Sequence, residues 1–336
     1  MNAGPQPGRE AVKMIGYFSS GIGRLPHLQQ LLEAPCRRVR WLGRQRDLTH
    51  IMGWGRKPTA ARARRFARDR GLPYISIEDG FLRSVGLGVE GAAPHSLAVD
   101  YSGIYYDATG PSDLESLIIN GDFDEAELAR AARGIELMRT RRLSKYNNAA
   151  DHYRDPRLQG RAAVLVVDQT FADPSVACGL ADGASFANML DSAIANHPEA
   201  QILVKVHPDV LAGKKQGYLA ELAQRRDCLL LDADISPWAA LDLVDEVYVV
   251  TSQMGFEALM AGKIVHCFGM PFYAGWGLTR DALNCPRRGL KRPLAQVFAA
   301  AYLRYCRYVD PLTGERCEFE QTAQRLVALR EGGKRG

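Results

Sequence analysis

Short apolar segments alternate with helical patterns through the first half of this 336-residue chain. Residues 12–17, 38–42 and 74–77 have the apolar or alternating patterns of β-strands, and residues 59–70 have the pattern of a helix. Strands that alternate with helices are typical of parallel sheets. The pattern therefore predicts an α/β domain over residues 14–155.

A second series of strands and helices follows a short linker at residues 155–157. Apolar runs typical of buried strands occupy residues 162–167, 201–206, 228–231, 246–250 and 264–268. They predict a second α/β domain over residues 160–290, before a C-terminal helical segment over 291–330 with a helix at 293–308. We expect two Rossmann-like domains facing each other across a cleft, since open parallel sheets bind ligands at the carboxyl ends of their strands. The C-terminal helices are expected to pack back on the first domain.

The composition is that of an ordinary globular protein. Hydrophobic residues make up 46% of the chain and charged residues 24%, which excludes disorder over most of its length. No stretch reaches about 18 apolar residues, so no membrane-spanning helix is predicted, and residues 1–13 lack the apolar core of a secretory signal. The seven cysteines show no CxxC spacing, which favours reduced thiols in the cytoplasm and argues against a zinc site.

Charge is distributed unevenly along the chain. Residues 1–83 carry 16 Lys and Arg against 6 Asp and Glu, a balance of +10, whereas residues 84–336 carry 27 against 32, a balance of −5. A basic N-terminal region on a mildly acidic body predicts an anionic partner for that region. Nucleic acid, anionic lipid and an acidic sugar all satisfy this requirement.

The second domain has one strand end suited to a phosphate, although the chain has neither a Walker A motif nor GxGxxG after its first strand. Pro208 ends the strand and fixes the turn, so that His207 can donate to a phosphate oxygen, with Lys205 as a nearby positive charge. The alternative is a histidine that is satisfied by a backbone carbonyl.

Another segment of the same domain runs from a strand through Ser252 into a helix at Gly255. Free N–H groups at such a helix start favour phosphate, and Glu257 in the first turn can accept from a ribose diol. The alternative is an ordinary N-cap with a favourably placed acid. Two such segments at strand ends of one domain favour a nucleotide site.

Carboxylates follow strands in both domains. Glu78 and Asp79 end a strand of the first domain, and Asp168 and Asp173 follow the first strand of the second. Carboxylates that face each other across a cleft suit glycosyl transfer through an oxocarbenium-like transition state, with one as nucleophile and the other as acid/base. The alternative is that they are solvated or capping side chains.

Aromatic residues gather in two further segments. Those in the Gly- and Pro-rich residues 268–279 fit either a platform for a sugar or packing between the domains. The predicted helix at 293–308 carries an aromatic stripe that indicates core or interdomain contacts, with contact to a lipid headgroup as the alternative.

Several motifs occur together in this chain. They are Glu78-Asp79-Gly80-Phe81-Leu82-Arg83-Ser84, Gly103-Ile104-Tyr105-Tyr106-Asp107, Leu143-Ser144-Lys145-Tyr146-Asn147, Asp168-Gln169-Thr170 with Asp173, and the segments 205–209, 252–259 and 271–281. In this combination the chain resembles the KpsC/LipA family of capsule polysaccharide biosynthesis proteins, which are retaining β-Kdo glycosyltransferases. The resemblance covers about residues 14–320 and is greatest to the N-terminal module of those proteins.

The resemblance implies a GT-B-like fold, CMP-Kdo as the donor substrate, and neither a cofactor nor a metal ion. It also implies an acceptor that ends in β-Kdo on a lysophosphatidylglycerol-type lipid. Such an acceptor places the protein in the cytoplasm or peripherally at the inner membrane, beside other capsule enzymes. Under this interpretation the basic region meets acidic sugars and phospholipid rather than nucleic acid.

Roles for individual residues follow from the same resemblance. Asp173 is the candidate nucleophile that forms a glycosyl-enzyme adduct, and Glu78 is the candidate acid/base, with Asp79 as its competitor. Arg83 is expected to pair with the Kdo carboxylate, since its planar guanidinium suits bidentate contact. The residues expected to contact the nucleotide or substrate are Lys205, His207, Pro208, Ser252, Gly255, Glu257, Gln169 and Ser175.

Family members typically hold two transferase modules in tandem, whereas this chain has one. It is therefore expected to be an excised module, the partner of a separate enzyme, or a protein that adds a single type of linkage. The alternative function is a catalytically silent module that binds Kdo or CMP and assists a separate transferase.

Overall fold

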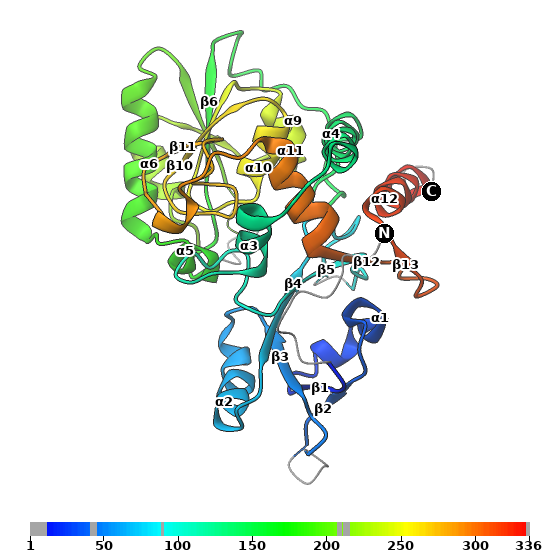
Figure 1. The fold of residues 1–336 in the computed structure, drawn as a ribbon. Coiled ribbons are helices and arrows are strands. Elements are labelled where there is room, and N and C mark those ends of the chain that lie inside the picture. The colour runs from blue at the N-terminus through cyan, green and yellow to red at the C-terminus, as the bar shows by residue number, and fades with distance from the viewer. Residues whose placement is uncertain (1–11, 41–45, 89–90, 207–209, 211–215, 334–336) are drawn as a thin grey trace.

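The chain folds into an α/β structure built on two β-sheets (Figure 1). The computed structural model describes residues 12–40, 46–88, 91–206, 210 and 216–333. In Figure 1 the N-terminal strands and α2 form a lower lobe, and the second sheet with its helices forms an upper body. Two α/β units, each with its own sheet, give the GT-B-like architecture that the sequence predicts.

The first sheet has seven strands in the order β13-β12-β5-β4-β3-β1-β2. They are β1 (Ile15–Tyr17), β2 (Cys36–Arg38), β3 (His50–Trp54), β4 (Tyr74–Asp79), β5 (Ser96–Asp100), β12 (Cys306–Val309) and β13 (Arg316–Cys317). The pairings among β1 to β4 are parallel, as expected, whereas β5, β12 and β13 are antiparallel to their neighbours. The sheet is therefore mixed rather than parallel, because β5 runs antiparallel to β4 and the C-terminal segment adds two further strands in antiparallel pairings.

The second sheet has six strands in the order β11-β10-β9-β6-β7-β8, each parallel to its neighbours. They are β6 (Ala163–Val167), β7 (Gln201–Lys205), β8 (Leu229–Leu231), β9 (Glu246–Val249), β10 (Ile264–Cys267) and β11 (Arg280–Asp281). Every residue of β6 is buried, as expected for a central strand that is covered on both faces. The five apolar runs predicted as strands in this half are confirmed.

Helices pack on both sheets, α2 on β3, and α6 on β6 and β9. The α-helices are α1 (Leu28–Leu32), α2 (Ala61–Asp69), α3 (Asp113–Asn120), α4 (Glu125–Thr140), α5 (Pro174–Cys178), α6 (Gly183–Asn196), α8 (Ala220–Arg225), α9 (Pro237–Leu241), α10 (Met254–Met260), α11 (Leu294–Phe298) and α12 (Phe319–Gly333). Short 3-10 turns lie at Ile22–Arg24, Pro58–Ala60 and Pro286–Arg288.

The C-terminal segment differs from the helix predicted at 293–308. α11 continues as a π-helix at Ala299–Tyr305, after which the chain becomes strand β12 and pairs with β5. The segment 291–330, predicted to be helical, thus also contributes two strands. Pairing of β12 with the edge of β5 that β4 leaves free outweighs the local helical pattern. Its last helix, α12, packs back on α4 as expected.

One hydrophobic core joins the two halves of the molecule. It contains Phe81, which follows β4, together with Leu165 of β6, Phe256 of α10 and Tyr302 of the π-helix. The centroids of the Phe81 and Tyr302 rings lie 5.4 Å apart. Burial of these side chains on both sides of the junction fixes the relative position of the two sheets.

Three of the four aromatic residues of the segment 268–279 lie inside this core. Phe272, Tyr273 and Trp276 are each at most 4% exposed, and the Phe272 ring centroid lies 4.7 Å from that of Phe81. Packing between the halves, one of the two predicted roles, is therefore confirmed for these side chains.

Candidate active site

Glu78 and Asp79 end strand β4, where it pairs with β5. Because successive strand residues point to opposite faces, the two carboxyl groups have different surroundings. Glu78 is 9% exposed, and its Oε1 accepts a hydrogen bond from Nε1 of Trp54 at 2.6 Å. Burial raises the pKa of Glu78, and the charges of Lys145 and Lys57 act in the opposite direction. Glu78 therefore holds its proton at higher pH than an ordinary glutamate.

Asp79 is committed to an ion pair with Arg83, whose Nε donates to its Oδ1 at 2.7 Å. Nη1 of Arg83 donates further to Oγ of Ser84 at 2.9 Å and to the carbonyl of Ala92 at 3.1 Å. The sequence predicts that Arg83 meets a substrate carboxylate, whereas the structure pairs its buried side chain with Asp79. Of the two candidate acid/base residues, Glu78 has the carboxyl group without an arginine partner in the described part of the chain.

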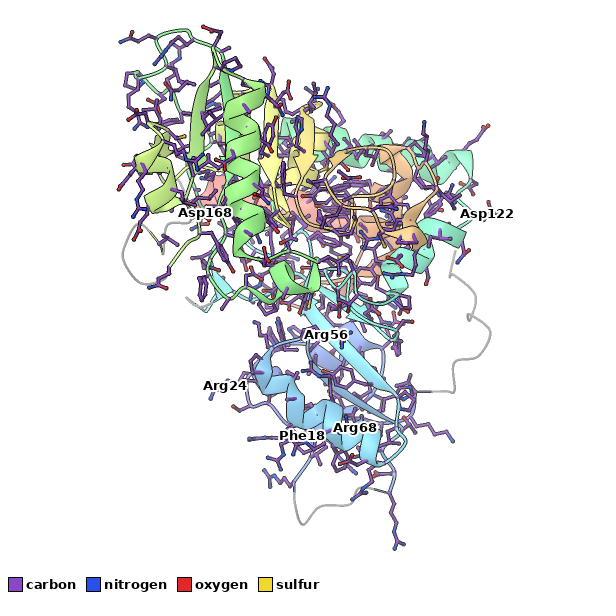
Figure 2. All side chains as sticks on the ribbon, turned by 90° about the vertical axis from the view of Figure 1, so that its left-hand side faces the viewer. Phe18, Arg24, Arg56, Arg68, Asp122 and Asp168 are labelled. Carbon is purple, nitrogen blue, oxygen red and sulfur yellow. The ribbon has the colours of Figure 1, made fainter. Side chains whose placement is uncertain are left out.

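Tyr106 brings Glu78 and Asp173 into one neighbourhood. A Cβ atom on Gly55 would lie 2.1 Å from the Tyr106 hydroxyl and 2.9 Å from Oε2 of Glu78, so these two atoms flank the same glycine. Burial raises the pKa of Tyr106, and the charges of Glu78 and Asp173 raise it further. The hydroxyl accepts a hydrogen bond from the backbone N–H of Arg56 at 2.8 Å, and Figure 2 shows Arg56 at the junction of the lobe and the body. The Tyr106 hydroxyl thus lies near Glu78 and interacts electrostatically with Asp173 from the other half of the chain.

Asp173 is fixed by the turn that starts α5. Its Oδ1 accepts from the backbone N–H of Ser175 at 2.9 Å and so caps the helix. Ala172 before it has a φ of 61°, in the left-handed region, and Pro174 after it is the first helical residue. The predicted capping role is therefore confirmed, and the same turn holds the half-buried carboxylate in a defined position.

Gln169, Ser175 and Thr251 form a hydrogen-bonded cluster that joins the ends of β6 and β9. Oε1 of Gln169 accepts from the Thr251 backbone N–H at 2.9 Å, and its Nε2 donates to Oγ1 of Thr251 at 3.0 Å. The hydroxyls of Ser175 and Thr251 lie 3.1 Å apart. Thr251 is absent from the residues predicted for the site, although it lies in the Ser252 segment.

Asp168 has a structural role in the neighbouring loop. It accepts backbone hydrogen bonds from Gln169 at 2.9 Å, Tyr218 at 3.0 Å and Leu219 at 3.2 Å. A Cβ atom on Gly217 would lie 2.3 Å from Oδ2 of Asp168, so only glycine fits this close approach. Figure 2 shows Asp168 on the body, away from the lobe.

Ser252 and Gly255 shape the start of α10. Oγ of Ser252 accepts from the backbone N–H of Met254 at 3.2 Å, and its carbonyl accepts from the hydroxyl of Tyr273 at 2.5 Å. A Cβ atom on Gly255 would lie 2.1 Å from that hydroxyl, which explains the glycine. These contacts hold the turn before α10, but the N-cap of this helix is Gln253, which makes no side-chain capping bond, so the predicted alternative of an ordinary N-cap is not what the structure shows.

Glu257 is buried at the junction rather than exposed at a helix surface. It is 3% exposed, and burial raises its pKa to about 8 against the opposing effects of Lys145 and Lys205. Nζ of Lys205 donates to the carbonyl of Ile235 at 3.3 Å. Burial lowers the pKa of Lys205, while Asp234 and Glu257 oppose that effect. The structure thus brings Lys205 and Glu257 together, as expected for one site.

Lys145 lies between the two halves and is missing from the predicted site residues. Its backbone carbonyl accepts from the N–H groups of Arg83 at 3.1 Å and Ser84 at 3.3 Å. Its ammonium group interacts electrostatically with Glu78 of β4 and with Glu257 of α10. The segment 143–147 is one of the motifs on which the family resemblance rests, so the sequence does point to this segment. Nothing in the sequence assigns a chemical role to Lys145 itself.

Two predicted contacts, His207 and Pro208, lie outside the described residues, and their place in the site stays a prediction. Among the residues that the structure describes, no group of three or more His, Cys, Asp or Glu side chains is arranged to hold a metal ion. Within the same ranges, no helix is long and apolar enough to cross a membrane.

Known proteins resemble this chain over most of its length. The family of capsule polysaccharide biosynthesis proteins matches residues 49–314. The capsule polysaccharide modification protein LipA of Neisseria meningitidis serogroup B is 47% identical over 317 residues, which are 91% of this chain and 44% of LipA. The lipopolysaccharide-processing protein LpsZ of Rhizobium meliloti is 39% identical over 83% of this chain and 64% of LpsZ. The chain thus spans less than half the length of LipA.

Two solved structures cover nearly the whole chain. KpsC of Thermosulfurimonas dismutans, described as a beta Kdo 2,4 transferase, has a TM-score of 0.89 and 45% identity over 95% of this chain and 99% of that one. The structure described as the beta Kdo 2,7 transferase of the same KpsC has a TM-score of 0.71 and 31% identity over the same shares. By sequence and by fold, this chain belongs to the KpsC/LipA family of capsule polysaccharide biosynthesis proteins.

Proposed function

We propose that this chain is a retaining glycosyltransferase that moves Kdo from CMP-Kdo to an acceptor ending in β-Kdo, with Asp173 as nucleophile and Glu78 as acid/base. The observation that supports this most strongly is that the Tyr106 hydroxyl lies near Glu78 and interacts electrostatically with Asp173, a carboxylate from the other half of the chain. Retaining glycosyl transfer needs two carboxyl groups at close quarters. We propose Kdo as the transferred sugar because two similar solved structures are described as Kdo transferases.

The reaction proceeds in two displacements. A carboxylate oxygen of Asp173 bonds to the anomeric carbon of Kdo while the bond from that carbon to the phosphate oxygen breaks, and CMP leaves with the electron pair. The acceptor hydroxyl then attacks the same carbon, the bond to Asp173 breaks, and Glu78 takes the hydroxyl proton. Two inversions give net retention.

The leaving group determines what else the site requires. Cytidine monophosphate carries less charge than a nucleoside diphosphate, so its departure depends less on a divalent cation. We therefore propose that the enzyme uses no metal ion and keeps its activity in EDTA. Complete loss of activity in EDTA, restored by a divalent cation, would contradict this.

The two solved relatives differ in the linkage named for them, and the similarity favours one. This chain is 45% identical to the 2,4 transferase and 31% identical to the 2,7 transferase. We propose a 2,4 linkage on that ground. NMR analysis of the product identifies the acceptor hydroxyl directly.

The basic lobe is the proposed acceptor side. Arg62, Arg65 and Arg68 are exposed on α2, and Figure 2 shows Arg68, Arg24 and Phe18 on the lobe. Exposed cations of this kind attract acidic sugars and anionic phospholipid headgroups. We propose that the lobe meets the anionic glycolipid at the inner membrane and does not bind nucleic acid.

The experiment that tests the proposal compares two capping aspartates. Purified protein is incubated with CMP-Kdo and a β-Kdo-terminated acceptor, and turnover is measured for Asp173→Asn and for Asp182→Asn. Both residues cap helices of the same half, so both substitutions carry similar costs in stability. We expect loss of at least about a thousandfold for Asp173→Asn and near-normal turnover for the control. Equal turnover in the two variants would exclude Asp173 as nucleophile, and CMP binding without any turnover would favour a catalytically silent module.

A further inference from the structure

The proposed donor carries a carboxylate on its anomeric carbon, so a transferase must place a cation beside the reacting carboxyl groups. We infer that the ammonium group of Lys145, rather than the guanidinium of Arg83, binds this carboxylate and thereby selects sugar acids. The inference rests on the proposed function and concerns the same site.

Arg83 already donates three hydrogen bonds within the protein. Its Nε donates to Asp79 and its Nη1 donates to Ser84 and to the carbonyl of Ala92. A Cβ atom on Gly88 would lie 2.4 Å from Nη2, so the backbone there closes around the remaining nitrogen. The side chain is 7% exposed. A substrate carboxylate that bound Nε of Arg83 would have to displace Asp79, whose side chain is only 16% exposed, and breaking such an ion pair is costly.

The ammonium group of Lys145, in contrast, has no direct partner among the described residues. In the ranges that the structure describes, its ammonium group has no ion-pair or hydrogen-bond partner, and its one ring contact is with Tyr146, at 5.9 Å from the centroid. Its backbone is nevertheless fixed, because its carbonyl accepts two N–H bonds and Tyr146 bridges to Ser84. A half-buried cation without a direct partner is unfavourable unless a ligand supplies one.

The position of Lys145 suits this task. Its ammonium group lies 5.9 Å from the ring centroid of Tyr146, whose hydroxyl donates to Oδ2 of Asp79 at 3.5 Å. Its charge also interacts with Glu78 at the end of β4 and with Glu257 of α10. Burial lowers the pKa of Lys145, but the neighbouring Tyr105, Asp79, Tyr146 and Glu78 together raise it above its usual value. The ammonium group therefore stays charged. A sugar carboxylate is repelled by the surrounding carboxyl groups and attracted by this cation.

The test compares ligands that differ only in charge. Binding of free Kdo and of its methyl ester is measured by titration calorimetry for the wild type, Lys145→Met, Lys145→Arg and Lys263→Met. Lys263 is the control, since it forms only a surface ion pair with Asp245 at 3.5 Å. Circular dichroism confirms that each variant is folded.

We expect the wild type and Lys263→Met to prefer Kdo over the ester by at least about tenfold, as charged hydrogen bonds do. Lys145→Met should lose this preference, and Lys145→Arg should keep part of it. In turnover assays the same loss appears as a higher KM for CMP-Kdo with a smaller change in kcat. A merely structural role for Lys145 would lower affinity for both ligands alike and leave the preference intact.

Other results would overturn the inference. If folded Lys145→Met keeps the wild-type preference while Arg83→Met loses it, Arg83 is the binding residue. If the wild type turns over CMP-Kdo and Lys145→Met still prefers Kdo over its methyl ester, only the role of Lys145 is contradicted. If the wild type neither turns over CMP-Kdo nor binds Kdo, the proposed function is contradicted, and with it this inference.

Discussion

At the scale of single residues, the sequence predicts which side chains carry chemistry better than it predicts their partners. The sequence predicts Glu78 and Asp173 as site carboxylates that follow strands, and in the structure both interact electrostatically with Tyr106. The sequence also predicts that Arg83 binds the substrate, whereas the structure pairs it with Asp79, four residues earlier. Tyr106 and Lys145 lie in motifs of the family resemblance, but the sequence assigns no chemical role to either residue. Their importance comes from where the fold places them, which one sequence does not reveal.

Glu257 makes stability depend on pH in a direction that can be predicted. Burial raises its pKa to about 8 in the folded protein, whereas in the unfolded chain it titrates near its ordinary value of about 4.3. The unfolded state therefore releases this proton first, and the stability that Glu257 contributes when protonated is lost as pH rises from about 4 to 8. Glu257→Gln has no such proton. Its stability relative to wild type should rise by roughly 2–5 kcal/mol between pH 5 and pH 8.5.

Urea unfolding of wild type and Glu257→Gln at the two pH values measures this difference. Both proteins share all other titrating groups, so the contributions of those groups to the pH dependence of stability cancel in the comparison. A difference between the two proteins that stays constant, or falls, from pH 5 to pH 8.5 would mean that Glu257 is ionised in the folded state throughout.

At the scale of elements, apolar runs predict strands well and predict their direction poorly. All five runs in the second half form parallel strands. In the first sheet β5 and β12 pair antiparallel, and the predicted helix at 293–308 ends at Tyr305. Residues 306–309 pair with residues about 200 positions away, so no local pattern encodes that choice. Tertiary pairing decides the end of this helix.

The start of α10 provides a test at the same scale. Gly255 has no room for a side chain, because Cβ would lie 2.1 Å from the hydroxyl of buried Tyr273. Gly255→Ala should therefore destabilise the protein by about 1–3 kcal/mol. Gly110→Ala is the control, since nothing lies within 4 Å of a Cβ atom there. Adding Tyr273→Phe should recover part of the loss in thermal unfolding, and no recovery would place the strain elsewhere.

At the scale of the whole molecule, one buried hydrophobic core connects the two sheets. The core that contains Phe81 and Phe256 crosses the junction. Glu115 of α3 adds a buried link, because it accepts from Nε of Arg287 at 2.6 Å and from Nε of Arg288 at 2.8 Å. Shared burial of this kind should make both halves unfold in a single transition.

Removal of one partner from this buried link should be costly. Glu115→Gln leaves the almost fully buried Arg288 without its carboxylate, and we expect a loss of about 3–5 kcal/mol. Glu136→Gln, which breaks an exposed pair with Arg139, should cost about 0–1 kcal/mol. Calorimetry checks both values. Two separate transitions in the wild type would show that the halves unfold independently.

The central claim is that Asp173 forms a covalent bond with the transferred sugar. Intact-protein and peptide mass spectrometry after incubation with CMP-Kdo alone, without acceptor, tests it most directly. We predict an adduct with the mass of one Kdo residue on the peptide that contains Asp173, which disappears on addition of acceptor and never forms in Asp173→Asn. Full turnover by the wild type with an adduct on another residue, or undiminished turnover by Asp173→Asn, would contradict the claim.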